Sequence, residues 1–252
     1  MSFAHLVCHS YYSFMRGTSS LTELCRAAAE AGMTRLALTD VNGVYGAVRF
    51  WEEARDAGLD PIIGADLRAG GERAVLLAMT AGGYERMCRV ITSLHLDDGF
   101  SLSRALAEDR EGLAALCFGA DMAERLLEGG RENLYVALGP GPGARELLGF
   151  CRKRGLPPVA AGDIYFVKPG DRGLHRLLRA IDLNTTPSRV AADELAHPSS
   201  WLASASEMER RFPHAPEALA NAADLAERCA MAGPPWGGLL FPEYRGLGEA
   251  EA

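Results

Sequence analysis

Hydrophobic and polar positions follow one pattern that occurs three times along the chain, at residues 20–40, 46–66 and 144–163. In each copy an amphipathic helical stretch ends at a glycine, and a short apolar run then leads to an aspartate. A glycine just past a helix supplies the left-handed cap conformation. The apolar runs are too short for helices and are typical of buried parallel strands. The pattern therefore predicts an α/β fold built on a parallel sheet.

Other apolar runs of strand length extend this sheet. Together the candidate strands lie at residues 5–9, 36–38, 62–63, 74–79, 113–118, 134–138 and 159–161. After Phe166 the pattern changes, because only helical stretches and a glycine- and proline-rich end follow. We therefore expect a barrel over residues 1–170, an appended helical region over 171–232 and a connector over 233–252.

Three aspartates follow predicted strands: Asp40, Asp66 and Asp163. Because parallel strands all end at one edge, we expect these carboxylates at the rim where α/β folds hold active sites. There they could bind a hard cation such as Mg²⁺ or Mn²⁺. The alternative is structural, since an aspartate after a strand often caps the next helix or turn. The turn-forming residues after Asp40 favour that alternative at this position.

His9 lies at the end of the first predicted strand, and the other histidine of that strand is His5. Four positions of extended chain span about 13 Å, so these two histidines cannot bind one ion. His9 is therefore either an isolated ligand or a structural residue. The glycine-rich segment at 139–143 lacks the lysine and spacing of a phosphate-binding loop.

Composition limits the classes of function. The net charge of −7 argues against a dedicated nucleic-acid-binding surface, so contact with DNA is expected only indirectly. There is no apolar run of about 18 residues and no secretory signal, which predicts a cytoplasmic protein without membrane contact. The six cysteines form no CxxC pair, so we expect free thiols rather than a zinc ribbon.

Three segments resemble those of a known family. They are FAHLVCHSYYSFMRGTSS at 3–20, LALTDVNGVYGAVRFWEEARDAGLDPIIGAD at 36–66 and GLPPVAAGDIYFVKPGD at 155–171. The chain resembles the polymerase and histidinol phosphatase (PHP) domain, most closely that of bacterial DNA polymerase III alpha subunits, including their error-prone branch. This resemblance implies a distorted (β/α)7 barrel with an appended C-terminal helical segment. It also implies that a polymerase region continues after residue 252.

The departures from the family pattern fall on its metal ligands. Ligand positions of the family are occupied here by Val7, Arg16, Val41, Asp66, Gly139, Pro140 and Tyr165. His9, Asp66 and Asp163 are the nitrogen and oxygen donors that the comparison leaves. Valine has no lone pair, and the Arg16 guanidinium competes with a cation for carboxylates. We therefore expect Arg16 to form a charge-assisted network with Asp163, Asp66 or Asp40 in place of metals.

The resemblance thus favours a metal-depleted PHP domain that acts as a structural and protein-interaction scaffold in DNA replication or translesion synthesis. No cofactor and no catalytic residue are expected, and the site is a vestigial rim. Its members are His9, Arg16, Asp40, Asp66, Asp163 and Tyr165. The expected partners are the remainder of the polymerase chain and a proofreading exonuclease or another replisome subunit.

Two alternatives stay open. The chain could be a metal-dependent phosphoesterase or 3′–5′ exonuclease that binds Zn²⁺, Mn²⁺ or Mg²⁺ through His9, Asp66 and Asp163. It could also be a barrel that binds a small molecule without catalysis, although no residue pattern names such a ligand.

Overall fold

The computed structural model describes residues 3–139, 141 and 143–237. Its sheet has six strands, and each strand lies beside its neighbours in sequence. The strands are β1 (Arg35–Leu38), β2 (Asp60–Ala69), β3 (Glu72–Ala78), β4 (Leu113–Cys117), β5 (Leu134–Leu138) and β6 (Pro158–Ala160). These strands confirm six of the expected apolar runs.

The strand directions differ from the prediction of a parallel sheet. β1 and β2 are parallel, as are β4, β5 and β6 among themselves, but β3 is antiparallel to both of its neighbours. The cause is a tight turn at Gly70 and Gly71, whose φ angles of 56° and 82° suit a two-residue hairpin. The prediction was wrong here because β2 and β3 form this hairpin instead of being joined through a helix.

The expected strand at residues 5–9 is an extended segment that closes the ring. On one side, the backbone N–H groups of Ala37 and Thr39 donate to the carbonyls of His5 and Cys8, at 3.0 and 2.8 Å. On the other side, Ile164 pairs with this segment through two bonds of 2.9 and 3.0 Å. The segment therefore joins β1 to the chain that follows β6, which gives the distorted barrel that the resemblance implies.

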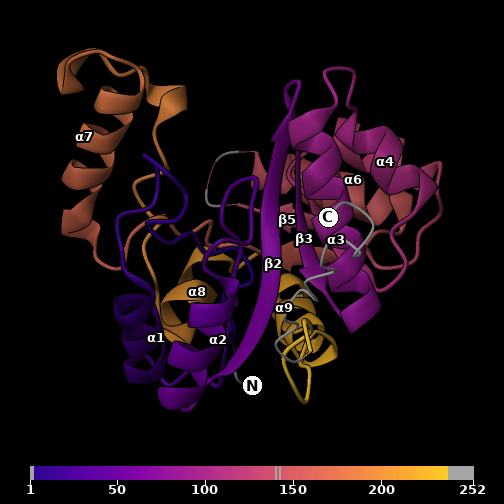
Figure 1. Cartoon of the computed structure of the whole chain (residues 1–252), viewed down its shortest axis with the longest axis horizontal. Helices are drawn as coiled ribbons and strands as arrows, with labels where there is room; N and C mark the ends of the chain where they lie inside the picture. The colour runs from indigo at the N-terminus through magenta and orange to yellow at the C-terminus, as the bar shows by residue number, and fades with distance from the viewer. Residues whose placement is uncertain (1–2, 140, 142, 238–252) are drawn as a thin grey trace, which may run out of the picture.

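Helices surround the ring in Figure 1, with α1 and α2 to one side of β2, and α3, α4 and α6 to the other. The helices before residue 155 are α1 (Leu21–Glu30), α2 (Ala47–Asp56), α3 (Ala81–Leu96), α4 (Leu102–Glu108), α5 (Ala120–Leu127) and α6 (Ala144–Arg154). A capping box of Ser20 and Glu23 starts α1. The glycine at 155 ends α6 in the left-handed conformation, as the pattern predicts.

The appended helices also occur where they are expected. They are α7 (Arg172–Asp182), α8 (Ala205–Arg211) and α9 (Pro216–Arg228), with short 3₁₀ turns at Pro169–Asp171, Pro187–Arg189 and Ala192–Glu194. α7 stands apart from the ring in Figure 1. Most of the expected connector, from 238 to 252, lies outside the described residues. No helix of the described chain is long and apolar enough to cross a bilayer.

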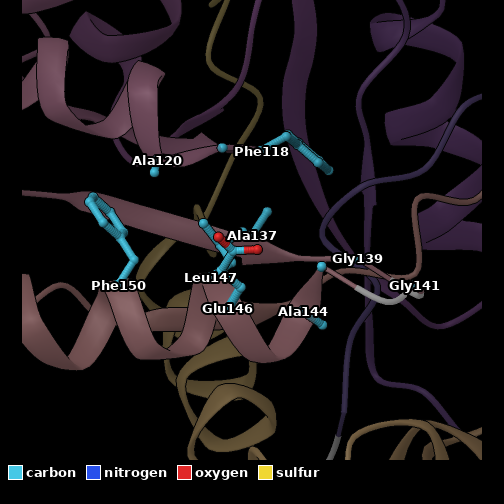
Figure 2. Close-up of a pocket in the computed structure, with 11 residues that line it drawn as sticks. Phe118, Ala120, Ala137, Gly139, Gly141, Ala144, Glu146, Leu147 and Phe150 are labelled. Atoms are coloured by element: carbon cyan, nitrogen blue, oxygen red, sulfur yellow. The ribbon is translucent and has the colours of Figure 1, made fainter.

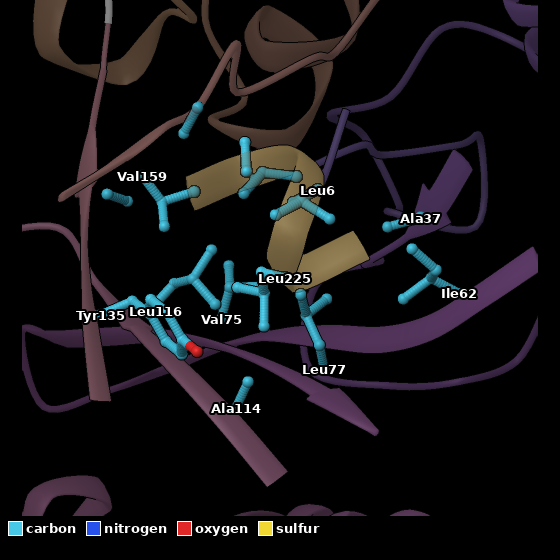
Figure 3. Packing of buried hydrophobic residues seen from close by; sticks show 14 of the residues in the cluster. Leu6, Ala37, Ile62, Val75, Leu77, Ala114, Leu116, Tyr135, Val159 and Leu225 are labelled. Atoms are coloured by element: carbon cyan, nitrogen blue, oxygen red, sulfur yellow. The ribbon is translucent and has the colours of Figure 1, made fainter. Parts of the chain in front are cut away.

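The core fills the ring and continues into α9. Leu6 of the closing segment, Leu77 and Leu116 of the sheet and Leu225 of α9 lie close together in Figure 3. The Asn221 side chain of α9 also donates to the Pro158 carbonyl at 2.8 Å. α9 therefore packs on the sheet and contributes side chains to the buried core.

Candidate functional site

Three of the predicted rim residues come together in the structure. His9 ends the closing segment, Asp66 lies within β2, and Asp163 follows β6 with a φ of 48°. One donor atom from each lies within 4.8 Å of the others. His9 and Asp66 are fully buried, whereas the Asp163 side chain is 20% exposed. These three residues are the donors that the resemblance leaves at the rim, and the structure brings their side chains together.

Two arginines that the sequence analysis did not single out bind these carboxylates. The Arg73 guanidinium bridges both, with Nη2 at 2.9 Å from Asp66 Oδ2 and 2.6 Å from Asp163 Oδ1, and Nη1 at 3.1 Å from Asp163 Oδ2. Arg68 Nη2 donates to the same Asp66 oxygen at 2.6 Å. We call His9, Asp66, Arg68, Arg73 and Asp163 the rim network.

His9 is held on two sides by oxygen acceptors. Its Nδ1 lies 2.8 Å from the Ile164 carbonyl, and its Nε2 lies 3.0 Å from Asp66 Oδ2. Each ring nitrogen of His9 therefore faces an oxygen. The Tyr165 ring stacks on this imidazole with 4.0 Å between centroids, and its hydroxyl accepts from Arg68. His9 is therefore held in place by an oxygen at each ring nitrogen and by the stacked Tyr165 ring.

The pKa values of the network follow from this pairing. Burial by itself raises the pKa of Asp66, but Arg73, His9 and Arg68 together hold it well below its usual range. Burial also opposes ionisation of Asp163, and Arg73 lowers its pKa in the same way. Burial lowers the pKa of Arg73, yet the two aspartates raise it well above its ordinary value. Both carboxylates and both guanidinium groups are therefore charged.

Asp40 lies outside the rim network. Its carboxylate accepts bonds from the Ser10 N–H at 2.7 Å, the Ser10 hydroxyl at 2.8 Å and the Ser13 hydroxyl at 2.6 Å. Burial raises the pKa of Asp40, and the two serines oppose that rise. Asp40 thus anchors the loop after the closing segment, which is the structural role weighed from the sequence.

The expectation for Arg16 was wrong. Within the described residues its side chain makes no ion pair with Asp40, Asp66 or Asp163, and Arg68 and Arg73 take the expected place. Burial and the nearby Arg179 and Arg68 lower the pKa of Arg16. A signal for the true partners was present in the sequence, because a Gly70-Gly71 hairpin places Asp66, Arg68 and Arg73 on one face.

A hollow of about 530 Å³ adjoins the rim network between β5, α6 and the start of α5. Figure 2 shows Phe118, Phe150 and Glu146 around it. The Arg73 guanidinium lies 3.7 Å from the centroid of the Phe118 ring, so a cation–π contact joins the rim network to the lining of this hollow. Gly139, one of the departures from the family's ligands, lines the hollow, whereas Pro140 lies outside the described residues.

The chain is thus a closed ring of strands with a histidine–aspartate cluster at its rim. The PHP domain family matches residues 5–135, and the chain belongs to that family.

Its curated relatives are DNA polymerases. The chain is 34% identical over 254 aligned residues to an error-prone DNA polymerase of Anaeromyxobacter sp. (strain K), and the match covers 90% of this chain and 22% of the relative. It is 29% identical to DNA polymerase III subunit alpha of Bacillus subtilis (strain 168), with 92% and 23% covered. This chain thus spans less than a quarter of the length of these relatives. Among solved structures, an amidohydrolase from Chromobacterium violaceum aligns with 65% of this chain and 88% of its own, at 13% identity and a TM-score of 0.43.

Proposed function

We propose that this PHP domain is a metal-depleted scaffold of an alpha-type DNA polymerase, and that the rim network replaces the ions of the family's metal centre. The observation that carries the proposal is the Arg73 guanidinium, which bridges Asp66 and Asp163. A guanidinium supplies fixed positive charge with directional donors, so it neutralises paired carboxylates as a cation would.

The donor set fits metal poorly because its atoms are already engaged. Asp66 Oδ2 accepts from His9, Arg68 and Arg73, and both oxygens of Asp163 accept from Arg73. Each ring nitrogen of His9 lies within 3.0 Å of an oxygen that an ion would have to displace. A divalent ion would have to displace Arg73 and would then face two guanidinium groups at short range.

Metal content and thermal stability test this proposal. We expect no stoichiometric metal after supplementation with Mn²⁺ or Zn²⁺, and no change in Tm. An ion held in the folded state at about 100 times its Kd adds about 2.7 kcal/mol to the free energy of unfolding. For a domain of this size that raises Tm by several degrees. Stoichiometric metal together with such a rise in Tm would overturn the proposal.

A matched pair of variants sharpens the test. Arg73→Gln frees Asp163 and removes one of the two guanidinium groups at Asp66, so this variant should bind Mn²⁺ more tightly than the parent. Arg49→Gln removes an exposed arginine of α2 and should leave Mn²⁺ binding unchanged. Equal Mn²⁺ affinity in the parent and Arg73→Gln would show that Arg73 does not stand in for a cation.

One observation favours a second candidate, a metal-dependent phosphoesterase or 3′–5′ exonuclease. Donor atoms of His9, Asp66 and Asp163 lie within 4.8 Å of one another, a spacing that a single ion could bridge. If this candidate holds, the purified chain hydrolyses a phosphodiester in the presence of Mn²⁺ or Zn²⁺, and Asp163→Asn abolishes the activity.

The proposed scaffold would bind other parts of the replication machinery. The polymerase relatives support the remainder of an alpha-type chain as one partner, and a proofreading exonuclease is the other that we propose. α7 offers an apolar stripe for such contacts, because Leu174, Leu177 and Ile181 are 47%, 46% and 55% exposed. We place this role in the cytoplasm, in DNA replication or in repair by translesion synthesis.

A further inference from the structure

Exposed aromatic rings gather beside the mouth of the barrel. Tyr11, Phe14 and Tyr45 are 39%, 80% and 68% exposed, and they belong to the loops after the closing segment and after β1. A hollow of about 490 Å³ opens among these loops. We call it the aromatic hollow, and its lining residues are Tyr12, Phe14, Arg16, Val41, Asn42, Tyr45 and His95. Exposed rings around a hollow mark a contact site rather than ordinary surface.

The tyrosine rings of these loops lie against neighbouring groups. The Tyr45 ring lies against Gly43, where a Cβ would come within 2.2 Å of the ring. Tyr12 lies against Gly46 in the same way, at 2.7 Å, and stacks on Tyr11 with 4.7 Å between centroids. Ordered rings lose little conformational entropy on binding, so they are suited to receive a flat ligand.

The backbone of these loops stores strain. Met15 and Asn42 adopt left-handed φ angles of 56° and 52°, which side chains other than glycine adopt at a cost. The Asn42 side chain secures its loop by bonds to the backbone of Arg68, at 2.7 and 3.0 Å. Both strained residues flank the aromatic hollow, a position typical of functional sites.

The hollow also contains a positively charged side chain, that of Arg16. Among the described residues, Arg16 makes no ion pair or side-chain hydrogen bond, although its guanidinium is half-buried. Its charged neighbours are Arg179, Arg68 and Asp182, and the Asp182 carboxylate is already paired with Arg179. An anion bound at Arg16 would relieve this repulsion.

We propose that the aromatic hollow binds single-stranded DNA, with bases stacked on Phe14 and Tyr45 and a phosphate at Arg16. Flat rings beside a cationic group are the combination by which proteins bind single strands without reading sequence. The net charge of −7 predicts only indirect contact with DNA, but the described residues that line this hollow include an arginine and no carboxylate. The proposal holds whether or not the rim network excludes metal, because it uses none of the network's carboxylates.

Fluorescence anisotropy with the full chain and a labelled oligothymidylate of about 16 nucleotides tests the proposal. We expect salt-sensitive binding that Phe14→Ala and Tyr45→Ala each weaken at least about fivefold. Arg16→Gln should reduce the slope of log K against log salt by about 0.7, because it removes one phosphate contact. Arg26→Gln on α1 and Leu177→Ala on α7, both at exposed positions, should change neither quantity.

Two further variants separate stacking from general apolar contact. Phe14→Trp keeps an aromatic face and should retain binding, whereas Phe14→Leu keeps the apolar character and should lose it. Unchanged Tm values show that the exposed substitutions leave the fold intact. No binding at low salt would overturn the proposal. Binding that Phe14→Leu retains in full, or that Arg26→Gln weakens as much as Arg16→Gln does, would also overturn it and would favour a protein partner for this hollow.

Discussion

Arg73 is the residue on which the chemistry of the rim depends. Its guanidinium joins two carboxylates that come from different segments of the chain, and it rests on the Phe118 ring. The sequence predicted that Asp66 and Asp163 would meet, because both follow apolar runs of strand type. It predicted Arg16 rather than Arg73 between them, because the position of Arg73 depends on the register of a hairpin rather than on the local pattern.

Replacing Arg73 by methionine should lower the free energy of unfolding by about 2–4 kcal/mol, because it leaves two carboxylates without their main counter-charge. Partial exposure of Arg73 and Asp163, at 23% and 20%, keeps the loss below that of a fully buried pair. Urea unfolding at neutral pH measures it, with Arg49→Gln as the control.

The loss should also depend on pH. The pKa values of Asp66 and Asp163 are depressed in the folded state, so their stabilisation is present above the ordinary value of about 3.9 and is lost as the pH falls below it. Parent and Arg73→Met should therefore converge in acid. A neutral-pH difference below about 0.5 kcal/mol, the size of an ordinary surface substitution, would contradict the role of Arg73.

His5 gives a second residue-scale prediction. Burial, with a smaller contribution from Arg211, lowers the pKa of His5 to about 4 although its Nε2 bonds the Ala203 carbonyl at 2.9 Å. Because the folded-state pKa is depressed, protonation below about pH 6.5 favours the unfolded chain. Between pH 7.5 and 4.5 the parent should lose about 2–3 kcal/mol more stability than His5→Gln. Parallel pH profiles for the two proteins would contradict this prediction.

At the scale of elements, the sequence located the strands better than it oriented them. Apolar runs predict where a strand lies because burial depends on composition, whereas direction depends on the connection. β2 and β3 are joined by Gly70 and Gly71 alone, so they must be antiparallel. Arg68 shares a face with Asp66 because it lies two positions further along β2, and the reversal brings Arg73 opposite Arg68 on that same face. The missed hairpin therefore explains why Arg73 was missed.

A side chain at Gly71 should destabilise the β2–β3 turn. Its φ of 82° lies in the left-handed region, and space around it is open, so the cost of a Cβ there comes from the backbone alone. Gly71→Ala should destabilise the protein by about 1–2 kcal/mol. Gly149→Ala, at an equally open site within α6, should instead stabilise it by about 0.5–1 kcal/mol. Thermal unfolding of the two variants measures both signs, and shifts of the same sign would contradict the argument.

At the scale of the whole molecule, the helical region after the barrel supplies part of the barrel's own core. Leu225 of α9 is 1% exposed and packs among sheet residues, so we propose that the barrel and α9 unfold as one unit. The sequence predicted the helices from their periodicity and described them as appended. It did not show how far they are integrated, because the contacts of α9 are with residues distant in the chain.

Leu225→Ala should therefore lower the free energy of unfolding by about 3 kcal/mol and leave a single cooperative transition. Leu177→Ala, on the exposed face of α7, should change stability by at most about 0.5 kcal/mol. Circular dichroism and tryptophan fluorescence in urea would follow both variants. Two separate transitions in Leu225→Ala would show that α9 is an independent unit.

The closing segment also determines when the fold can be completed. Its hydrogen bonds join His9 to Ile164 and His5 to Ala203, which are 155 and 198 positions apart. At ribosomal speeds of about 5–20 residues per second, the last of these partners emerges about 10–40 s after the first. Until then β1 and the chain after β6 keep unpaired edges. The nascent chain therefore passes through a period of exposure to misassembly that ends only when the closing segment meets Ile164 and Ala203.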